Sequence, residues 1–149
     1  MIGVEILKPV AVLAGWTMVM WLWMYATRIP AINKLPKPSE AGADQGWTGA
    51  MLEGLIPREV QWKAHNYNHL HEAPTVFYAV ALALALIGQG DGLNAQIAWA
   101  YVALRIAHSV WHATVNKVAL RFLLFALSSL ALMALTLHLL LAVFHAPAA

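Results

Sequence analysis

The chain has 149 residues, of which 61% are hydrophobic and only 11% are charged. A soluble globular domain carries roughly 25% charged residues, so these charges are too few to coat a water-facing surface of this size. The net charge of +2 and the lack of a basic run interleaved with aromatic residues argue against a nucleic-acid partner. The absence of cysteine excludes disulfides, thiolate metal sites and a cysteine nucleophile. We therefore expect an integral membrane protein in contact with lipid.

Four apolar segments are long enough to cross the bilayer, which takes about 20 residues. We predict transmembrane helices that form a single all-α domain over residues 1–149, and their approximate ranges are 7–28, 62–88, 93–116 and 120–144. The first of these helices has no charge between residues 9 and 27 and is not preceded by a basic region. We therefore interpret it as a retained span rather than a cleaved signal peptide.

The connections between the predicted helices differ in length and polarity. Residues 29–61 form the one long connection, which is rich in proline and acidic residues, and within it residues 46–57 are predicted to lie along the membrane surface. Short glycine-rich or polar turns, at residues 88–92 and 116–120, join the later helices and predict antiparallel neighbours.

The distribution of basic residues predicts the orientation of the chain. Seven basic residues belong to the side of the first and third connections: Arg28, Lys34, Lys37, Arg58, Lys63, Lys117 and Arg121. Lys8 is the one basic residue of the opposite side. By the positive-inside rule, these connections are predicted to be cytoplasmic and both termini to lie outside, in a bacterial inner membrane.

Ionisable residues inside the predicted spans indicate a polar cavity that opens toward the cytoplasm. On the second predicted helix His65, His69 and Glu72 share one face, and on the third Arg105, His108 and His112 share another. A charge within a span usually faces the bundle and has a partner, so we predict a buried Glu72–Arg105 ion pair. Such a pair could serve only to fix the register of the helices. Arg121 begins the fourth helix at the same membrane level.

Two sequence runs in these helices resemble the MAPEG family, the membrane-associated proteins of eicosanoid and glutathione metabolism. Residues 66–78 (NYNHLHEAPTVFY) are similar to the family's signature in its second helix. Residues 105–112 (RIAHSVWH), followed by Arg121, are similar to its third helix and the start of its fourth. The resemblance covers about residues 60–140 and suggests a bacterial-type member.

The resemblance implies a homotrimer of four-helix bundles, with glutathione bound between subunits near the cytoplasmic face. It implies that Arg121 is the catalytic residue that stabilises the glutathione thiolate. The cofactor-binding residues that it implies are Asn68, His69, Glu72, Arg105, His108 and His112. Three positions depart from the family pattern: His112 replaces a frequent tyrosine, Phe122 replaces a serine found in some members, and Asn68 matches the family asparagine only after a shift of one residue.

Three functions remain open from the sequence. The first is a glutathione-dependent transferase or peroxidase that acts on apolar electrophiles or lipid hydroperoxides. The second is a non-catalytic membrane subunit or scaffold, for which small-residue faces on the second and fourth helices would suit close helix packing. The third is a metal site built from the paired histidines and Glu72, which the positive charge of Arg105 disfavours.

Overall fold

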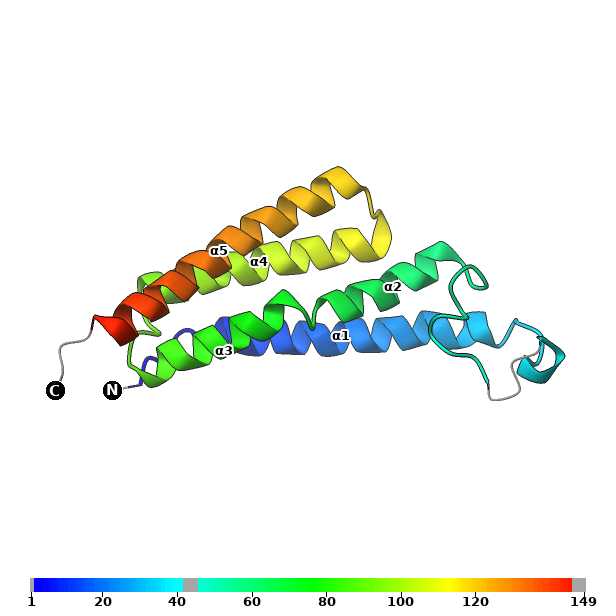
Figure 1. Cartoon of the computed structure of the whole chain (residues 1–149), viewed down its shortest axis with the longest axis horizontal. Helices are drawn as coiled ribbons and strands as arrows, with labels where there is room; N and C mark the ends of the chain where they lie inside the picture. Colours follow the sequence, from blue (N-terminus) through cyan, green and yellow to red (C-terminus); the bar gives the residue numbers. More distant parts are fainter. Residues whose placement is uncertain (1, 42–45, 146–149) are drawn as a thin grey trace.

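The computed structural model describes residues 2–41 and 46–145, and in these ranges it is all-α. Its elements are α1 (Leu7–Ile32), the short 3-10 helix η1 (Pro38–Ala41), α2 (Arg58–His69), α3 (Ala73–Leu86), α4 (Leu93–Thr114) and α5 (Val118–Phe144). Because α2 and α3 follow each other as one interrupted rod, the chain forms a bundle of four rods with both termini at one end (Figure 1). The prediction of an all-α membrane bundle of four helices is confirmed.

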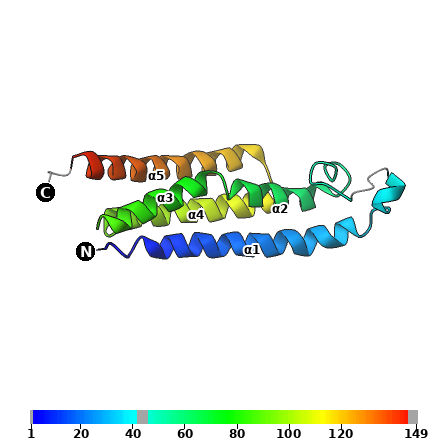
Figure 2. The ribbon, with the colours of Figure 1, turned by 60° about the horizontal axis from the view of Figure 1, so that its bottom comes forward.

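Three of the rods are apolar enough to cross a membrane. Among the described residues, the helices that satisfy this by length and composition are Leu7–Ile32, Arg58–Leu86 and Val118–Phe144. α4 has 22 residues but a polar buried face, made of Asn94, Arg105, His108, Ser109 and His112. It packs against α1, α2 and α5, so the other rods cover that face, as the rotated view in Figure 2 also shows.

The second rod is broken near its middle. We predicted a single helix over residues 62–88, whereas the structure begins the rod at Arg58 and interrupts it between His69 and Ala73. Pro74 accounts for the break, because proline has no N–H and its ring clashes with the carbonyl four residues earlier. In a bilayer the freed backbone groups need other partners. His71 Nδ1 lies 2.8 Å from the Tyr67 carbonyl oxygen, and the Thr75 hydroxyl donates to the His71 carbonyl at 2.6 Å.

The break changes the neighbours of the rod. α2 packs against α1 and α4, whereas α3 packs against α1 and α5. The predicted antiparallel pairing of the second and third helices therefore holds for α2 with α4, while α3 turns toward α5. The C-terminal part of the long connection contains turns at residues 49–55 and no helix. Leu52 and Ile56 bury their side chains there, with 3% and 4% exposure.

The bundle has two halves of different character. The apolar half contains α3 and the parts of α1, α4 and α5 beside it, and its core includes Leu13, Phe77, Tyr101 and Leu135. The rings of Phe77 and Tyr101 stack with their centroids 4.4 Å apart. The polar half contains α2, the C-terminal part of α4 and the start of α5. Its buried side chains include Gln61, Asn66, Arg105, His108, Ser109 and His112.

The N-terminal segment closes the far end of the apolar half. The Gly3 N–H donates to the Ala85 carbonyl at 3.0 Å, and the Ile6 N–H donates to the Gly90 carbonyl at 2.9 Å. Gly3 and Gly90 approach so closely that a Cβ on either would collide with the backbone of the other. This segment therefore fastens the start of α1 to the turn between α3 and α4.

Candidate functional site

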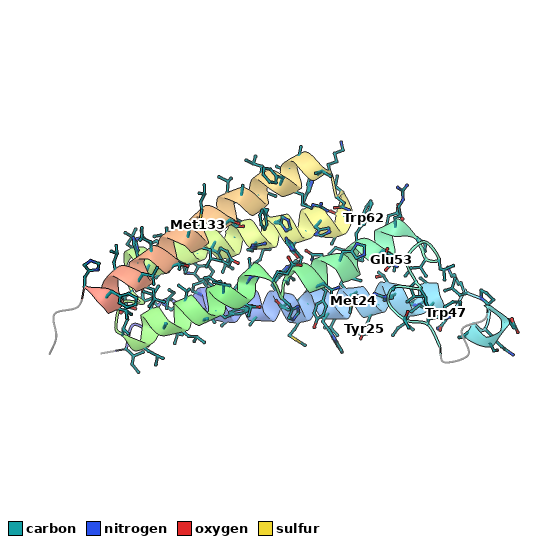
Figure 3. All side chains as sticks on the ribbon, viewed as in Figure 1. Met24, Tyr25, Trp47, Glu53, Trp62 and Met133 are labelled. Carbon is teal, nitrogen blue, oxygen red and sulfur yellow. The ribbon has the colours of Figure 1, made fainter. Side chains whose placement is uncertain are left out.

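A cavity of about 460 Å³ lies in the polar half, between α2, the end of α4 and the start of α5. Nine residues line it: His65, His69, Glu72, His108, His112, Val118, Arg121, Phe122 and Phe125. Its wall thus combines imidazoles, one carboxylate, one guanidinium and an apolar strip from α5. Glu53 and Trp62 lie toward this end of the bundle, whereas Met133 lies on α5 nearer the other end (Figure 3).

Three imidazole rings gather at one side of the cavity. The ring centroid of His69 lies 5.0 Å from that of His108 and 6.1 Å from that of His112, and the two α4 rings are 5.7 Å apart. Phe125 of α5 stacks on His69 at 5.7 Å with an interplanar angle of 27°. The helical spacing that placed His108 and His112 on one face therefore brings both to the same cavity as His69.

His69 is held by the carboxylate of Glu72. The distance from His69 Nδ1 to Glu72 Oε2 is 2.5 Å, and this contact spans the break between α2 and α3. When the Glu72 carboxylate is ionised it can only accept hydrogen bonds, and Nδ1 is then the atom that carries the proton in this contact. The second ring nitrogen, Nε2, is then the one that can accept a proton. The side chain of Glu72 is 65% exposed and that of His69 is 23% exposed.

Arg121 lies in the first turns of α5, where its guanidinium is oriented by an asparagine. Its Nη1 donates to Asn116 Oδ1 at 2.7 Å. Asn116 has a φ of +53°, a left-handed conformation that asparagine tolerates better than most residues. The turn therefore fixes the Asn116 side chain beside Arg121. The sequence predicts only a turn at Asn116, although an asparagine at a tight connection is typical of this backbone geometry.

The predicted Glu72–Arg105 ion pair is wrong. Glu72 bonds to His69 instead, while Arg105 is 1% exposed and lies behind the cavity wall. Its guanidinium carbon lies 5.5 Å from the Tyr101 ring centroid and 5.2 Å from that of Phe125. Within the described ranges its Nε and Nη2 atoms have no hydrogen-bond partner. Equal depth along two helices did not place the two side chains on facing sides, because the break at the end of α2 turns Glu72 outward.

The asparagine buried in the polar half is Asn66, not Asn68. Asn68 is exposed and does not line the cavity. Asn66 is fully buried and donates from Nδ2 to the Ser109 hydroxyl oxygen at 2.6 Å, and that oxygen also accepts the Trp16 indole N–H at 2.8 Å. Ser109 thus joins α1, α2 and α4. Asn66 lies three residues before His69, a spacing that places residues on one helix face and could have indicated its burial.

The histidines do not converge as metal ligands would. Within residues 2–41 and 46–145, no three His, Asp or Glu side chains are grouped so that they could hold a metal ion. His65 is also turned toward the long connection, since its Nε2 lies 2.6 Å from Glu53 Oε1. The geometry therefore gives no support to the metal-site alternative.

The chain belongs to the MAPEG family. The sequence profile of that family matches residues 6–141, which is nearly the whole chain and includes every residue that lines the cavity. Searches of curated proteins and of solved structures returned no match. The family assignment agrees with the helical membrane bundle and connects the protein at family level with glutathione-related chemistry.

Proposed function

We propose that this protein is a membrane-bound, glutathione-dependent transferase or peroxidase that acts on apolar electrophiles or lipid hydroperoxides. The observation that carries the proposal is the position of Arg121 in the wall of a cavity of about 460 Å³, which is within the size range of small-molecule sites. A nearby guanidinium favours a thiolate over a thiol, and the thiolate is the nucleophile. Because the chain has no cysteine, a bound co-substrate must supply the thiol.

The remaining polar groups suit an anionic peptide. His69, Glu72, His108 and His112 offer hydrogen bonds to its amide, amine and carboxylate groups. Arg105, directly behind the wall, is a buried charge without a carboxylate partner among the described residues. Such a charge is costly unless it is compensated. The carboxylates of bound glutathione would compensate this charge. Arg105 would then contribute to cofactor binding through the positive electrostatic field that it creates in the cavity.

The apolar strip of the wall indicates how a hydrophobic substrate reaches the thiolate. Val118, Phe122 and Phe125 line the cavity from α5, and Phe122 is 66% exposed on the outside of the bundle. α5 is the most apolar of the candidate spans, with a mean hydropathy of 2.2. An apolar electrophile dissolved in the bilayer would meet this strip first, beside Arg121.

We also propose that the protein is a homotrimer. Four polar side chains near the middle of the second rod are exposed in the single chain: Asn68, His71, Glu72 and Thr75. Lipid tails offer no hydrogen bonds to such groups, so a polar stripe at this depth needs another protein surface. A second copy of the chain would cover the stripe and complete the open side of the cavity. Under this proposal, Asn68 lies at the contact between subunits, beside the glutathione site.

The proposed orientation puts the cavity on the cytoplasmic side of a bacterial inner membrane. The turn between α4 and α5 and the connection between α1 and α2 lie at the same end of the bundle (Figure 1). That end carries all the basic residues of the two connections, and the opposite end carries Lys8. Glutathione is a cytoplasmic thiol, so this orientation gives the cavity direct access to it.

Titration of the purified protein with glutathione tests the proposal. Calorimetry would measure binding, and the ultraviolet absorbance of the thiolate would follow ionisation of the bound sulfur. We expect saturable binding with a thiolate signal that Arg121→Ala abolishes and that Arg58→Ala, which removes an exposed arginine outside the cavity, leaves intact. No saturable binding by the intact protein would contradict the proposal and favour the non-catalytic subunit.

Native mass spectrometry from mild detergent tests the proposed assembly. We expect three copies of the chain and no stoichiometric second protein. A Glu72→Gln variant should still form the trimer, because a neutral amide can make the same contacts across subunits. A monomer, or a complex with a different protein, would contradict the homotrimer.

A further inference from the structure

His69 differs from the other histidines of the cavity in its contact with a carboxylate that lines the same cavity. Its Nδ1 lies 2.5 Å from Glu72 Oε2, whereas His108 and His112 have no carboxylate partner among the described residues. A carboxylate on Nδ1–H fixes the tautomer of an imidazole and stabilises the imidazolium that forms when Nε2 takes a proton. The dyad of His69 and Glu72 therefore has the structure of an oriented proton acceptor.

The groups around this dyad determine what it can do. From α4, the rings of His108 and His112 face His69, and from α5 Phe125 stacks on it while Arg121 lines the same cavity. Arg105 lies behind Phe125. The positive charges favour an anion in the cavity but cannot accept a proton at neutral pH. Among the imidazoles that line the cavity, His69 is the one in direct contact with Glu72, so its ring is held in place with Nε2 turned away from the carboxylate.

We propose that His69, oriented by Glu72, is the general acid–base of the site, an inference that rests on the proposed use of glutathione. When glutathione binds, the S–H bond breaks, its electron pair remains on sulfur beside Arg121, and the proton passes to His69 Nε2. The proton thus stays inside the cavity rather than in the solvent. Arg121 stabilises the thiolate, and the dyad stores the proton.

The stored proton gives the site a preference among electrophiles. When the thiolate attacks an epoxide carbon, an S–C bond forms, the C–O bond breaks, and the alkoxide oxygen takes the proton from His69. When the thiolate attacks an aryl chloride, an S–C bond forms and chloride leaves with its electron pair. No proton is needed for that step, and the proton on His69 passes to solvent afterwards. Hydroperoxides resemble epoxides, since attack on the distal oxygen releases an alkoxide. His69 should therefore matter most for substrates that release an oxyanion.

Proton release on binding tests the storage step directly. Glutathione is mixed with the protein in weak buffer containing a pH indicator, while thiolate absorbance is recorded in the same sample. We expect one thiolate per occupied site with close to no proton released by the wild type, and one proton per thiolate released by His69→Asn. His138→Asn removes an imidazole outside the cavity that lies 2.6 Å from Asn94, and it should behave as the wild type.

Three results would overturn the assignment, and they differ from a failure of the proposed function. Thiolate formation with one proton released by the wild type would show that His69 does not store the proton. Zero release in His69→Asn would show that another group does. Binding without any thiolate would show that no proton is transferred. If the wild type does not bind glutathione at all, the proposed function itself fails.

Turnover of two model electrophiles tests the return of the proton. General acid–base catalysis contributes typically about 10²–10⁴-fold to a rate. We expect His69→Asn to lower kcat for styrene oxide by at least about 100-fold and kcat for 1-chloro-2,4-dinitrobenzene by less than about 10-fold. Glu72→Gln should lower the styrene oxide rate by an intermediate factor, because the imidazole remains without its carboxylate. Equal losses on both substrates would reduce His69 to a binding residue and contradict the proposal.

Discussion

The apolar and polar halves of the bundle bury side chains of opposite kinds within one continuous set of rods. In the apolar half, the α3 side chains interlock with those of α1 and α5 around the stacked rings of Phe77 and Tyr101. In the polar half, Gln61, Asn66, Arg105 and His112 each retain a buried amide, guanidinium or imidazole atom without a partner among the described residues, whereas the apolar half leaves the hydroxyls of Tyr78 and Tyr101 in that state. Buried unsatisfied groups are rare in folded proteins and tend to be found at functional sites. The apolar half is thus packed for stability, whereas the polar half leaves polar groups that a bound ligand would satisfy.

The break between α2 and α3 is the boundary between these halves. It lets α3 follow α5 and the apolar core, while α2 remains beside α4 and the cavity. It also positions Glu72 to reach back to His69 across the interruption. A continuous helix would have kept one set of neighbours along its whole length. The same proline that ends one helix thus makes room for the site.

We expect the greatest loss of unfolding free energy from a substitution in the apolar half. Phe77→Ala removes a fully buried ring that stacks on Tyr101, and such truncations cost about 3–5 kcal/mol. Unfolding in detergent by a denaturant titration would measure the loss. Phe144→Ala, which removes a ring that is 77% exposed, is the matched control and should be nearly neutral. A loss below about 1 kcal/mol for Phe77→Ala would mean that the apolar half does not carry the stability.

A smaller loss is expected from the hydroxyl that joins three helices in the polar half. Ser109→Ala leaves the Trp16 indole N–H and the Asn66 amide without their shared acceptor, which should cost about 1–3 kcal/mol. The same unfolding titration applies. Ser129→Ala is the control, because that hydroxyl donates to a carbonyl of its own helix. If the two variants were equally stable, the buried network would contribute nothing to the polar half.

A substitution in the turn before α5 should change the affinity for glutathione rather than the stability of the fold. Asn116→Gly keeps the left-handed backbone conformation but removes the oxygen that orients Arg121. Loss of a hydrogen bond to a charged group should weaken glutathione binding about tenfold, or about 1.4 kcal/mol. Calorimetric titration measures it, with Asn33→Gly at the end of α1 as a control outside the cavity. Unchanged affinity for glutathione would show that the hydrogen bond between Arg121 and Asn116 does not contribute to binding.

The smallest effect is expected at the edge of the polar half. Glu53→Gln alters a contact with His65 in which the two side chains are 55% and 45% exposed, respectively. Exposed ion pairs contribute about 0–1 kcal/mol, so stability should barely change. Glutathione binding should also be retained, because Glu53 does not line the cavity. A loss of glutathione binding in Glu53→Gln would show that the long connection contributes to the binding site.

The sequence predicted the fold well because the composition and length of apolar segments identify membrane helices. It also placed His69, Glu72, His108, His112 and Arg121 at one end, and these side chains line one cavity in the structure. Helical spacing predicts such a set, since residues three, four or seven apart share a face. This agreement concerns position, and the roles of these residues stay predictions.

Other parts of the site depend on geometry that spacing along one helix does not define. Arg105 and Glu72 have similar depth, yet they do not meet, because Pro74 interrupts the rod. Residue spacing does not predict how the chain rotates about its axis at such a break. Asn66 and Ser109 come together only once α1, α2 and α4 are packed, through a bond that joins residues 43 positions apart. Asn116 required the backbone conformation of its turn. Contacts between elements were therefore the part that the sequence did not reveal.

The polar buried face of α4 has a consequence for how the protein is made. An arginine at the centre of a helix costs about 2.5–3.5 kcal/mol when that helix enters a bilayer alone. α4 also carries His108, His112 and Asn94, whereas α5 follows it after a short turn and is strongly apolar. α4 should therefore enter the membrane as a hairpin with α5, after α1 and the second rod are in place to receive its polar side. Biosynthesis of this chain would then depend on the order in which its helices meet, not on the apolarity of each helix taken separately.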